Sequence, residues 1–452
     1  MIALAVSGGL RPAQTTNDGS ILFESANGVV LRYAGLKALD ASGRTVPSRL
    51  EVRGSEIRLI VEDQGAQYPL VVDPLWTQQQ KLTSSDGTLG DWFGYSVSVS
   101  GDTAVIGTVG GTAYVFVNSD GAWSLQAKLT ASDGAPGDYF GSAVSVSGDT
   151  AVIGASLKNR TQGAVYVFVR SGGVWSQQQE LTASDGLALD WFGYSVSASG
   201  DTAVIGASRK NNETGAAYVF VRSGGTWSQQ QELTASDGVA GDWFGDSVSV
   251  SGNTAVIGAW AKNEYHGAAY VFTRSGASWG QPQELLPSDG AASEGFGVSV
   301  SVDGDTALIG AFGQNGTGAA YLFLPSNGTW AQHQILTASD GVIGDSFGSS
   351  VSVSGDTALI GADGKNNQQG AAYIFVRSGS TWAQQQELAA SDGAAEDQFG
   401  FSGSVNGDKA VVGAFFATIN SSPCHRAAGV RSGSRKPHHD HPERYDIAGQ
   451  HG

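Results

Sequence analysis

The dipeptide Phe-Gly recurs along the chain at nearly constant spacing, and this repeat is the feature that most limits the fold. Seven copies are separated by 47, 52, 52, 52, 51 and 52 residues, and they begin at Phe93, Phe140, Phe192, Phe244, Phe296, Phe347 and Phe399. One further Phe-Gly, at Phe312, falls off this period. Periods of about 20–50 residues are typical of solenoids, propellers and other arrays. We therefore expect seven copies of one structural unit in these 452 residues, rather than several unrelated domains.

Each copy has the pattern of four β-strands. In the third copy polar and apolar residues alternate, and turn residues separate the apolar segments, so that we expect strands over 195–199, 202–207, 215–220 and 227–233. Gly-Asp or Gly-Asn stands between the first two strands of every copy, and Ser-Gly-Gly or a variant joins the last two. Such residues favour tight hairpin turns. The unit is therefore predicted to be an antiparallel meander.

An all-β fold, the seven-bladed β-propeller of four-stranded antiparallel blades, follows from this repeat. Radial repetition leaves only short, protected sheet edges. A β-solenoid is the main alternative, but it is typical of much shorter periods. The segment Trp76–Leu82 resembles a fourth strand without the three strands before it. We expect it to complete the seventh blade and close the ring, because pairing strands from both ends protects the exposed edges.

The flanking segments differ from the repeats. Residues 1–75 are predicted to be part of a small β domain, with strands at Val29–Tyr33, Arg49–Arg53 and Ile57–Val61, and the propeller is expected over 76–420. Residues 421–452 are basic and rich in histidine where a Gly-Ala-Ala-Tyr-Val-Phe motif is expected, which suggests a frameshift. The alternative is a metal site, although the spacing matches no zinc pattern; its ligands would be Cys424, His425, His438, His439 and His441.

Charge and composition exclude several functions. The chain has 25 Lys and Arg against 42 Asp and Glu, a net charge of −17, which repels nucleic acid and anionic membrane surfaces. Its apolar runs have strand length, far below the roughly 20 residues that a membrane-spanning helix needs. Cys424 is the only cysteine, so an internal disulfide is excluded. Residues 1–10 lack the basic region of a secretory signal.

The repeats resemble a known family. Phe-Gly opens a strand, Ile-Gly-Ala follows as at Ile153–Ala155, Leu-Thr-Ala-Ser-Asp-Gly precedes Phe-Gly, and Gly-Ala-Ala-Tyr-Val-Phe comes later in the copy. Over roughly Trp76–Ala414 this resembles the FG-GAP repeat of the integrin α-subunit propeller, and most of all its bacterial variety. The resemblance implies an extracellular or cell-surface module that binds a partner. We expect that partner to be a protein or a glycan, and the propeller to be a monomer.

The resemblance raises the question of calcium. Integrin-type repeats often carry an Asp-rich calcium loop between the first two strands. Here that connection is only Ser-Gly-Asp-Thr, as at Ser147–Thr150, with one carboxylate. Calcium needs about six to eight oxygen ligands. We therefore transfer no calcium ligands and expect no cofactor, with calcium as the one alternative.

An acidic pair five residues apart precedes every Phe-Gly. The pairs are Asp86 and Asp91, Asp133 and Asp138, Asp185 and Asp190, Asp237 and Asp242, Asp289 and Glu294, Asp340 and Asp345, and Asp392 and Asp397. One interpretation is structural: the first residue caps a turn and the second accepts hydrogen bonds from loop backbone. The other is a ring of carboxylates on one face that attracts cations or a basic partner. A glycosidase pair is disfavoured, because the copies look equivalent.

The binding face is predicted from where the copies differ. Variation concentrates in the loop between the second and third strands, which a propeller places on the same face as the acidic pairs. We expect aromatic side chains there to contact the partner, since aromatic residues are enriched in binding hot spots. These are Trp92, Trp191, Trp243, Trp260 and Tyr265. The alternative for the tryptophans before Phe-Gly is packing between blades.

Nucleophilic catalysis has little support in the sequence. Gly-x-Ser-x-Gly patterns around Ser278 and Ser346 are by-products of the repeat and do not lie at a strand-to-helix turn. Between Trp76 and Asn420 the only histidines are His266 and His333. We therefore expect a binding protein rather than an enzyme. The alternative is a metal-dependent or catalytic propeller, of hydrolase or lyase type, that uses its central channel.

Overall fold

The computed structural model describes residues 2–5, 11–15, 21–25, 28–33, 36–40, 44–53, 56–67, 71–74, 76–88, 90–290, 294–417 and 427–432. The chain divides into two compact units at the boundary between Pro74 and Leu75. Regular structure is almost entirely β, as predicted. None of the helices among these residues is long and apolar enough to cross a membrane.

The first unit contains nine strands in three antiparallel sheets, with the orders β1-β8-β7, β2-β3-β4 and β6-β5-β9. Their bounds are β1 (Ile2–Ala5), β2 (Arg11–Thr15), β3 (Ile21–Ser25), β4 (Gly28–Tyr33), β5 (Leu36–Leu39), β6 (Thr45–Val46), β7 (Ser48–Arg53), β8 (Glu56–Val61) and β9 (Val71–Pro74). The three strands expected from the sequence correspond to β4, β7 and β8.

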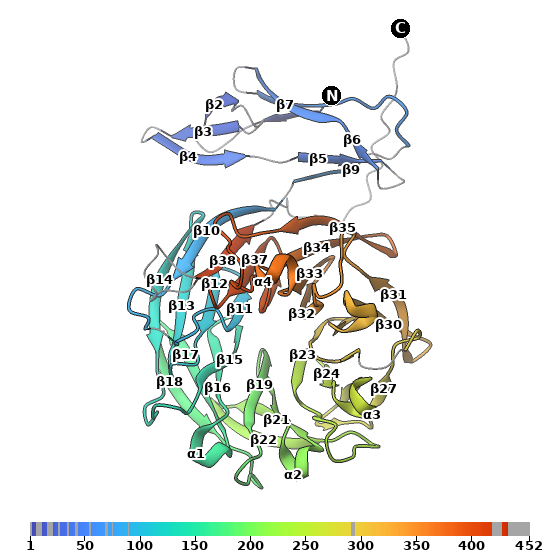
Figure 1. Ribbon diagram of the computed structural model, residues 1–452. Helices are drawn as coiled ribbons and strands as arrows, with labels where there is room; N and C mark the ends of the chain where they lie inside the picture. Colours follow the sequence, from blue (N-terminus) through green and yellow to red (C-terminus); the bar gives the residue numbers. More distant parts are fainter. Residues whose placement is uncertain are drawn as a thin grey trace. The chain divides into compact units, whose positions relative to one another are not determined.

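The second unit is a β-propeller, whose antiparallel sheets follow one another around a ring (Figure 1). Five of its sheets are meanders of four consecutive strands, called blades below. They are β11 (Ser96–Ser100), β12 (Thr103–Gly107), β13 (Ala113–Ser119) and β14 (Ala122–Leu129); β15 (Phe140–Ser147), β16 (Thr150–Ala155), β17 (Ala164–Ser171) and β18 (Val174–Leu181); β19 (Phe192–Ser199), β20 (Thr202–Ala207), β21 (Ala216–Ser223) and β22 (Thr226–Leu233); β28 (Val300–Asp303), β29 (Thr306–Ala311), β30 (Ala319–Ser326) and β31 (Thr329–Leu336); and β32 (Phe347–Ser354), β33 (Thr357–Ala362), β34 (Ala371–Ser378) and β35 (Thr381–Leu388).

One sheet has five strands because its outer strand is interrupted. The strands are β23 (Ser247–Ser251), β24 (Thr254–Ala259), β25 (Ala268–Ser275), β26 (Ser278–Trp279) and β27 (Gln283–Leu285). Both β26 and β27 pair with β25. Pro282 stands in the break, where the other copies have glutamine or, in one case, His333, and proline has no N–H to donate to a neighbouring strand.

The remaining sheet joins the two ends of the repeat region. Its order is β10-β38-β37-β36, formed by β10 (Thr77–Thr83), β38 (Ala427–Ser432), β37 (Lys409–Ala414) and β36 (Gly403–Asn406). The N-terminal strand β10 supplies the outer strand, which confirms the predicted closure. The third strand β38 comes from the segment 421–452 that the sequence analysis placed outside the propeller. It pairs with both β10 and β37, and so satisfies backbone groups on each side.

The glycines of the repeat lie where neighbouring blades approach each other most closely. A Cβ on Gly206, in the Ile-Gly-Ala motif of β20, would overlap the carbonyl oxygen of Gly245, which belongs to the next Phe-Gly. The Ser195 hydroxyl donates to the same oxygen at 2.8 Å. The same contacts close the ring, where Gly413 faces the Gly94 carbonyl and Ser402 donates to it at 2.8 Å. The Phe-Gly and Ile-Gly-Ala glycines are therefore required by packing.

Serine side chains connect the innermost strands of adjacent blades. The Ala198 N–H donates to the Ser145 hydroxyl at 3.0 Å, and the Val99 N–H donates to Ser404 across the closing seam at 3.0 Å. On the outer strands the side-chain amide of Gln386 makes two hydrogen bonds to the backbone of Trp76, at 2.7 and 2.8 Å. The serines that alternate with valine in the first strand thus accept hydrogen bonds from backbone N–H groups of the adjacent blade.

The phenylalanines of Phe-Gly fill the space between blades. All seven are at most 2% exposed. Phe140 belongs to a cluster that also contains Val115 from the preceding blade, and its ring centroid lies 5.5 Å from that of Tyr166. Each buried ring therefore contributes to two blades at once.

We expect Gly206→Ala to lower the free energy of unfolding by about 1–3 kcal/mol, because the added methyl group overlaps a backbone carbonyl that cannot move independently of its blade. Urea denaturation followed by tryptophan fluorescence measures this change. The control is Gly280→Ala, where the nearest atom to the new methyl group would be the Thr273 carbonyl oxygen at 3.5 Å. Equal stability of the two variants would contradict the packing argument.

Candidate functional site

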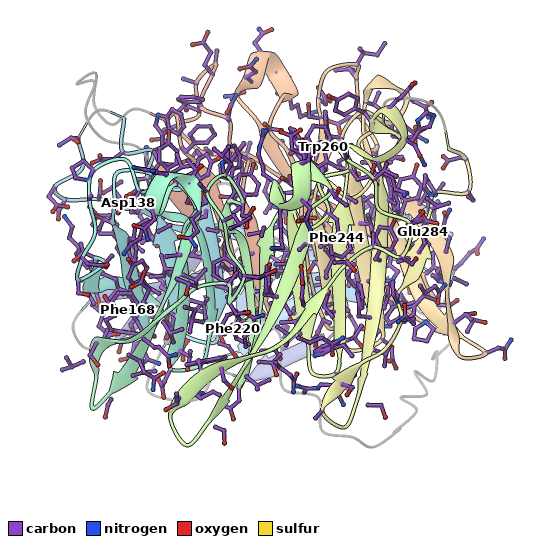
Figure 2. All side chains as sticks on the ribbon, turned by 90° about the horizontal axis from the view of Figure 1, so that it is seen from below. Asp138, Phe168, Phe220, Phe244, Trp260 and Glu284 are labelled. Carbon is purple, nitrogen blue, oxygen red and sulfur yellow. The ribbon has the colours of Figure 1, made fainter. Side chains whose placement is uncertain are left out.

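Two sets of loops meet at one end of the blades, which we call the loop face. The first set precedes each Phe-Gly and carries the acidic pairs. The second joins the second and third strands and contains α1 (Lys158–Thr161), α2 (Lys210–Glu213), α3 (Lys262–Tyr265), η1 (Gln314–Gly316) and α4 (Lys365–Gln368). The two sets are bonded together, since Trp243 N–H donates to the Glu213 carbonyl at 2.9 Å. Figure 2 shows Asp138 and Trp260 toward this face of the ring.

The second set of loops has an unusual backbone. In α2 three consecutive residues, Asn211, Asn212 and Glu213, have φ of 52°, 57° and 69°, in the left-handed region. Asparagine enters this region more readily than most residues, which explains the Lys-Asn-Asn sequence. The preceding residue Lys210 is buried. The loop thus holds a lysine ammonium group under the loop face.

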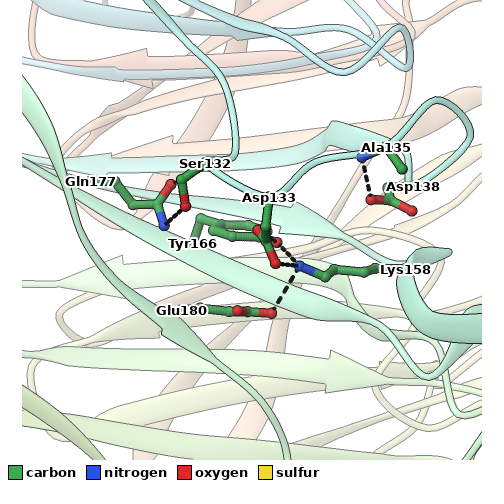
Figure 3. A network of polar contacts seen from close by, with 8 residues as sticks. All are labelled: Ser132, Asp133, Ala135, Asp138, Lys158, Tyr166, Gln177 and Glu180. Carbon is green, nitrogen blue, oxygen red and sulfur yellow. Dashed lines mark hydrogen bonds and ion pairs between the residues drawn. The ribbon is translucent and has the colours of Figure 1, made fainter.

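The acidic pair of the second blade shows what this lysine contacts (Figure 3). The Tyr166 hydroxyl donates to Asp133 Oδ1 at 2.7 Å, and the buried Lys158 ammonium contacts Asp133, Tyr166 and Glu180. The second member of the pair, Asp138, accepts a hydrogen bond from the Ala135 N–H at 2.8 Å. The first carboxylate therefore binds a tyrosine and a lysine, and the second fixes its own loop.

The same arrangement recurs around the ring. Lysine Nζ lies 2.7 Å from Asp185, 2.8 Å from Asp237 and 2.8 Å from Asp340 in the equivalent loops. In six of the pairs the second carboxylate accepts a backbone N–H from three residues earlier, and in the seventh, Asp289 and Glu294, that earlier residue lies outside the described part of the chain; the six acceptors are Asp91, Asp138, Asp190, Asp242, Asp345 and Asp397. These contacts give the acidic pairs a structural role in the loops.

In three blades the loop lysine is absent, and another side chain binds the first aspartate of the pair. Asp86 is bound by Lys128 at 2.5 Å and Asp392 by Lys81 at 2.6 Å, and both lysines stand on the outer strand where other copies have glutamate. Asp289 accepts from the Gln314 amide at 2.7 Å, and its outer strand has Ile335 in place of the glutamate. The loop lysine and the outer-strand glutamate are therefore lost together in all three blades, and an outer-strand lysine supplies the positive charge in two of them.

These contacts shift the pKa values of the groups involved. The Lys158 ammonium and Tyr166 hydroxyl hold the pKa of Asp133 below its usual value, and Lys210 does the same for Asp185. Burial, and then the charge of Asp185, raise the pKa of Glu232. The ionised form of the first aspartate is thus favoured in the fold.

Four of the predicted aromatic contact residues lie in one row over neighbouring blades. The Arg209 guanidinium lies between two tryptophans, 4.2 Å from the ring centroid of Trp191 and 4.7 Å from that of Trp243. Trp260 continues the row, with centroids 5.2 Å from Trp243 and 5.4 Å from Tyr265. The tryptophans are half-buried, and Tyr265 is 50% exposed. The fifth residue, Trp92, packs elsewhere, against Tyr95, Phe415 and Phe416.

A carboxyl group lies beneath this row. The Trp260 Nε1–H donates to Asp246 Oδ2 at 2.9 Å. Burial raises the pKa of Asp246 to about 7, although hydrogen bonds from Ser208 and Trp260 and the charge of Arg209 oppose this. Asp246 follows Phe-Gly directly, where the other copies have tyrosine, serine, valine or phenylalanine. This side chain is one of the functional candidates that the repeat pattern did not reveal.

Exposed aliphatic residues are a second feature missed in the sequence. They lie between the members of the acidic pairs and are at least 59% exposed: Leu187, Leu189, Val239, Val342 and Ile343. They were overlooked because these positions vary from copy to copy. Their signal was present, since a surface loop between two aspartates is an unfavourable place for leucine or isoleucine.

The catalytic and metal candidates are not assembled by the fold. Ser278 begins the short outer strand β26, and Ser346 stands before Phe-Gly, so neither lies at a strand-to-helix turn. His266 and His333 contact backbone carbonyls of Asn263 and Ser380. Across the described parts of the chain, no group of three or more His, Cys, Asp and Glu could hold a metal ion. Cys424 and the histidines from His425 onward lie outside those parts.

The turn between the first two strands does not fit calcium either. Its single carboxylate is occupied by arginine in three blades: Arg170 Nε lies 2.6 Å from Asp149, Arg222 Nε 2.7 Å from Asp201, and Arg377 Nε 2.7 Å from Asp356. One carboxylate bound to a guanidinium cannot supply the several oxygen ligands of a calcium ion.

We expect Lys210→Met to lower stability at neutral pH by about 1–3 kcal/mol, because it leaves Asp185 without its cation. The pKa of Asp185 is lowered in the fold, so the stabilisation is complete above the unfolded value near 3.8 and is lost as the pH falls through the folded value. The difference in free energy of unfolding between wild type and variant should therefore shrink as the pH falls to about 2–3. Urea denaturation across this pH range measures it.

The matched control is Lys210→Gln with Glu232→Ile, which copies the uncharged arrangement of Gln314 and Ile335. We expect this double variant to recover most of the stability that Lys210→Met loses. A loss independent of pH, or no recovery, would contradict an electrostatic role for the lysine.

We expect neither calcium nor a chelator to change the melting temperature of the propeller. The carboxylates of its loops and turns already bind lysine, arginine, tyrosine or backbone N–H groups. A ligand that binds only the native state must raise its melting temperature. A saturable increase with calcium, reversed by EDTA, would contradict this expectation.

Comparison with known proteins places the repeats in a family. A model of the FG-GAP repeat matches residues 76–121, 123–168, 175–220, 227–272, 279–323, 330–375 and 382–428. No curated protein matches the chain. Among solved structures, the crystal structure of the Saccharomyces cerevisiae Sqt1 is 12% identical, with a TM-score of 0.45, and the match covers 75% of this chain and 82% of that chain. The crystal structure of the mitotic checkpoint complex is 13% identical, with a TM-score of 0.48, and the match covers 78% and 93%.

The family match and the fold agree in detail. Each matched segment includes one Phe-Gly of the regular repeat and one Ile-Gly-Ala or its equivalent, with Thr108 in place of the alanine in the first copy and Val412 in place of the isoleucine in the last. The glycines of these motifs form the contacts between blades. With seven matched repeats over most of its length, this chain belongs to the FG-GAP repeat family.

Proposed function

We propose that this protein is a non-enzymatic binding module that recognises a partner protein through the loop face. Membership of the FG-GAP repeat family supports a binding role, and it supports a location outside the cell or at its surface. In this proposal the ring has seven blades, with the interrupted sheet of β23 to β27 counted as one, and the propeller acts as a monomer.

The exposed aliphatic residues of the loop face carry the proposal. Leu187, Leu189 and Val239 come from neighbouring loops and are 68, 66 and 59% exposed. Exposing aliphatic side chains to water is unfavourable, and covering them with another protein lowers the free energy. The nearby row of Trp191, Arg209 and Trp243 adds the residue types that are most enriched in binding hot spots.

The charges of the face define the partner further. The first aspartates of the pairs remain about half exposed, as in Asp185 and Asp237, although each binds a lysine. The chain as a whole carries a net charge of −17. We therefore propose a partner with an apolar patch flanked by Lys and Arg, since opposite charges at the rim of an interface accelerate association.

The test compares wild type, one triple variant and one single variant for binding to an array of purified extracellular and cell-surface proteins. We expect wild type to bind at least one array protein, and Leu187→Ser with Leu189→Ser and Val239→Ser to weaken that binding by about tenfold or more. The matched control is Val174→Ser, which changes an aliphatic side chain that is 69% exposed in the hairpin at the opposite end of a blade. We expect it to bind as wild type does.

Two results would overturn the proposal. One is binding that the triple variant retains, which would place the interface elsewhere. The other is self-association of wild type in sedimentation experiments that the triple variant abolishes, because the aliphatic residues would then join two copies of this chain. Thermal melting of each variant checks that its fold is intact.

A further inference from the structure

A pocket opens on the loop face where large side chains of the repeat are replaced by small ones. In the blade of β19 to β22 the residue before Phe-Gly is Trp191, and the second residue after Ile-Gly-Ala is Arg209, which stacks on it. The blade of β32 to β35 has Ser346 and Gly364 at these positions. The following copy has Gln398 where Trp243 would be equivalent. Three truncations thus coincide between two adjacent copies.

The resulting cavity has a volume of about 470 Å³. This lies within the range of roughly 300–1,000 Å³ typical of small-molecule sites. Apart from Val342 and Ile343, its lining is glycine and polar side chains, the latter being Asp345, Ser346, Asp363, Asn366, Asn367, Gln368 and Gln398. We call it the Ser346 pocket.

The amide side chains of the pocket stand on a fixed backbone. Gln398 N–H donates to the Gln368 carbonyl at 2.7 Å, and the Gln398 side-chain amide donates to Gln368 Oε1 at 3.3 Å. Gly364 N–H donates to the Asp345 carbonyl at 3.1 Å. Because these bonds position the loops before any ligand arrives, less conformational entropy is lost on binding.

Asp363 is the unusual residue of the pocket. Its Oδ1 atom is buried and has no hydrogen-bond partner among the described residues. Burial raises the pKa of the carboxyl group, because the Ser349 hydroxyl and the N–H groups of Asp363 and Gly364 stabilise it only in part. By contrast, Asp345 accepts from the Val342 N–H at 2.9 Å and lies 3.5 Å from Lys365. The other copies have valine, serine, tryptophan or phenylalanine in place of Asp363. A buried acceptor without a donor costs free energy, and a ligand hydroxyl group would remove that cost.

We propose that the Ser346 pocket binds a neutral saccharide residue. Amide and carboxylate groups offer the donors and acceptors that neighbouring sugar hydroxyls need. Ile343, which is 84% exposed at the pocket, offers an apolar surface for the C–H face of a sugar ring. Asp345, Asp363 and the net charge of −17 disfavour acidic sugars. The pocket is separate from the Leu187, Leu189 and Val239 surface and does not depend on the proposed protein partner.

The experiment uses the full chain and a panel of free monosaccharides: glucose, galactose, mannose, fucose, xylose and N-acetylglucosamine, with glucuronic acid as the acidic arm. Saturation-transfer NMR identifies binders, and calorimetry measures affinity for the best sugar and for a polysaccharide that contains it. We expect at least one neutral sugar to bind wild type and glucuronic acid not to bind.

Two variants test the pocket itself. Ser346→Trp fills it with the residue that other copies carry at the same backbone conformation, since φ is 59° at Ser346 and 58° at Trp191. Asp363→Ala removes the buried acceptor. We expect each to weaken sugar binding by about tenfold or more. The matched control is Tyr139→Trp, which makes the same aromatic residue at the same repeat position outside the pocket; it should bind as wild type does.

The proposal fails if no neutral sugar of the panel binds, if Ser346→Trp binds as wild type does while its melting temperature is unchanged, or if glucuronic acid binds best. The triple variant of Leu187, Leu189 and Val239 separates the two proposals. Sugar binding that persists in it supports an independent pocket, whereas sugar binding that is lost with it, in a folded protein, overturns the assignment to the Ser346 pocket.

Discussion

The close contact between backbone segments of adjacent blades is the constraint on which the ring depends. At each junction the carbonyl of a Phe-Gly glycine fits against an Ile-Gly-Ala glycine of the preceding blade, where a side chain would not fit. The buried phenylalanine beside it then packs against both sheets. Serine hydroxyls satisfy the carbonyl oxygen and the neighbouring N–H groups. The residues of the repeated motif therefore form the contact between each blade and the next.

The loops above this ring use charge in a balanced way. A buried lysine, a tyrosine and two carboxylates recur together, and each copy that lacks the loop lysine also lacks the outer-strand glutamate, which lysine or isoleucine replaces. Such balance is expected where charges are partly buried, because an unpaired charge is costly there. The acidic pairs thereby fix the loops that carry the exposed aliphatic side chains.

The repeat predicted most of the fold because strand alternation, turn residues and spacing are local properties. The interruption at Pro282 and the inclusion of β38 were harder to foresee, since one is a single exchange in a strand and the other follows a change in composition. The site was predicted less well. Lys210 reads as a solvated loop residue until the fold buries it. The Ser346 pocket needs Ser346, Gly364 and Gln398 together, and only the order of blades makes these neighbours.

The pairing of β10 with β38 has a consequence for how the protein folds. Thr77 lies opposite Ser432, so this ladder joins positions 355 residues apart in the chain. In all the other blades the strand pairings are local. Each of these blades can form once about 50 residues, one repeat period, have been synthesised. The closing ladder must wait for nearly the whole repeat region, and the cost of closing so long a loop falls on this one step. Until then both edges that it protects are open to pairing with other chains.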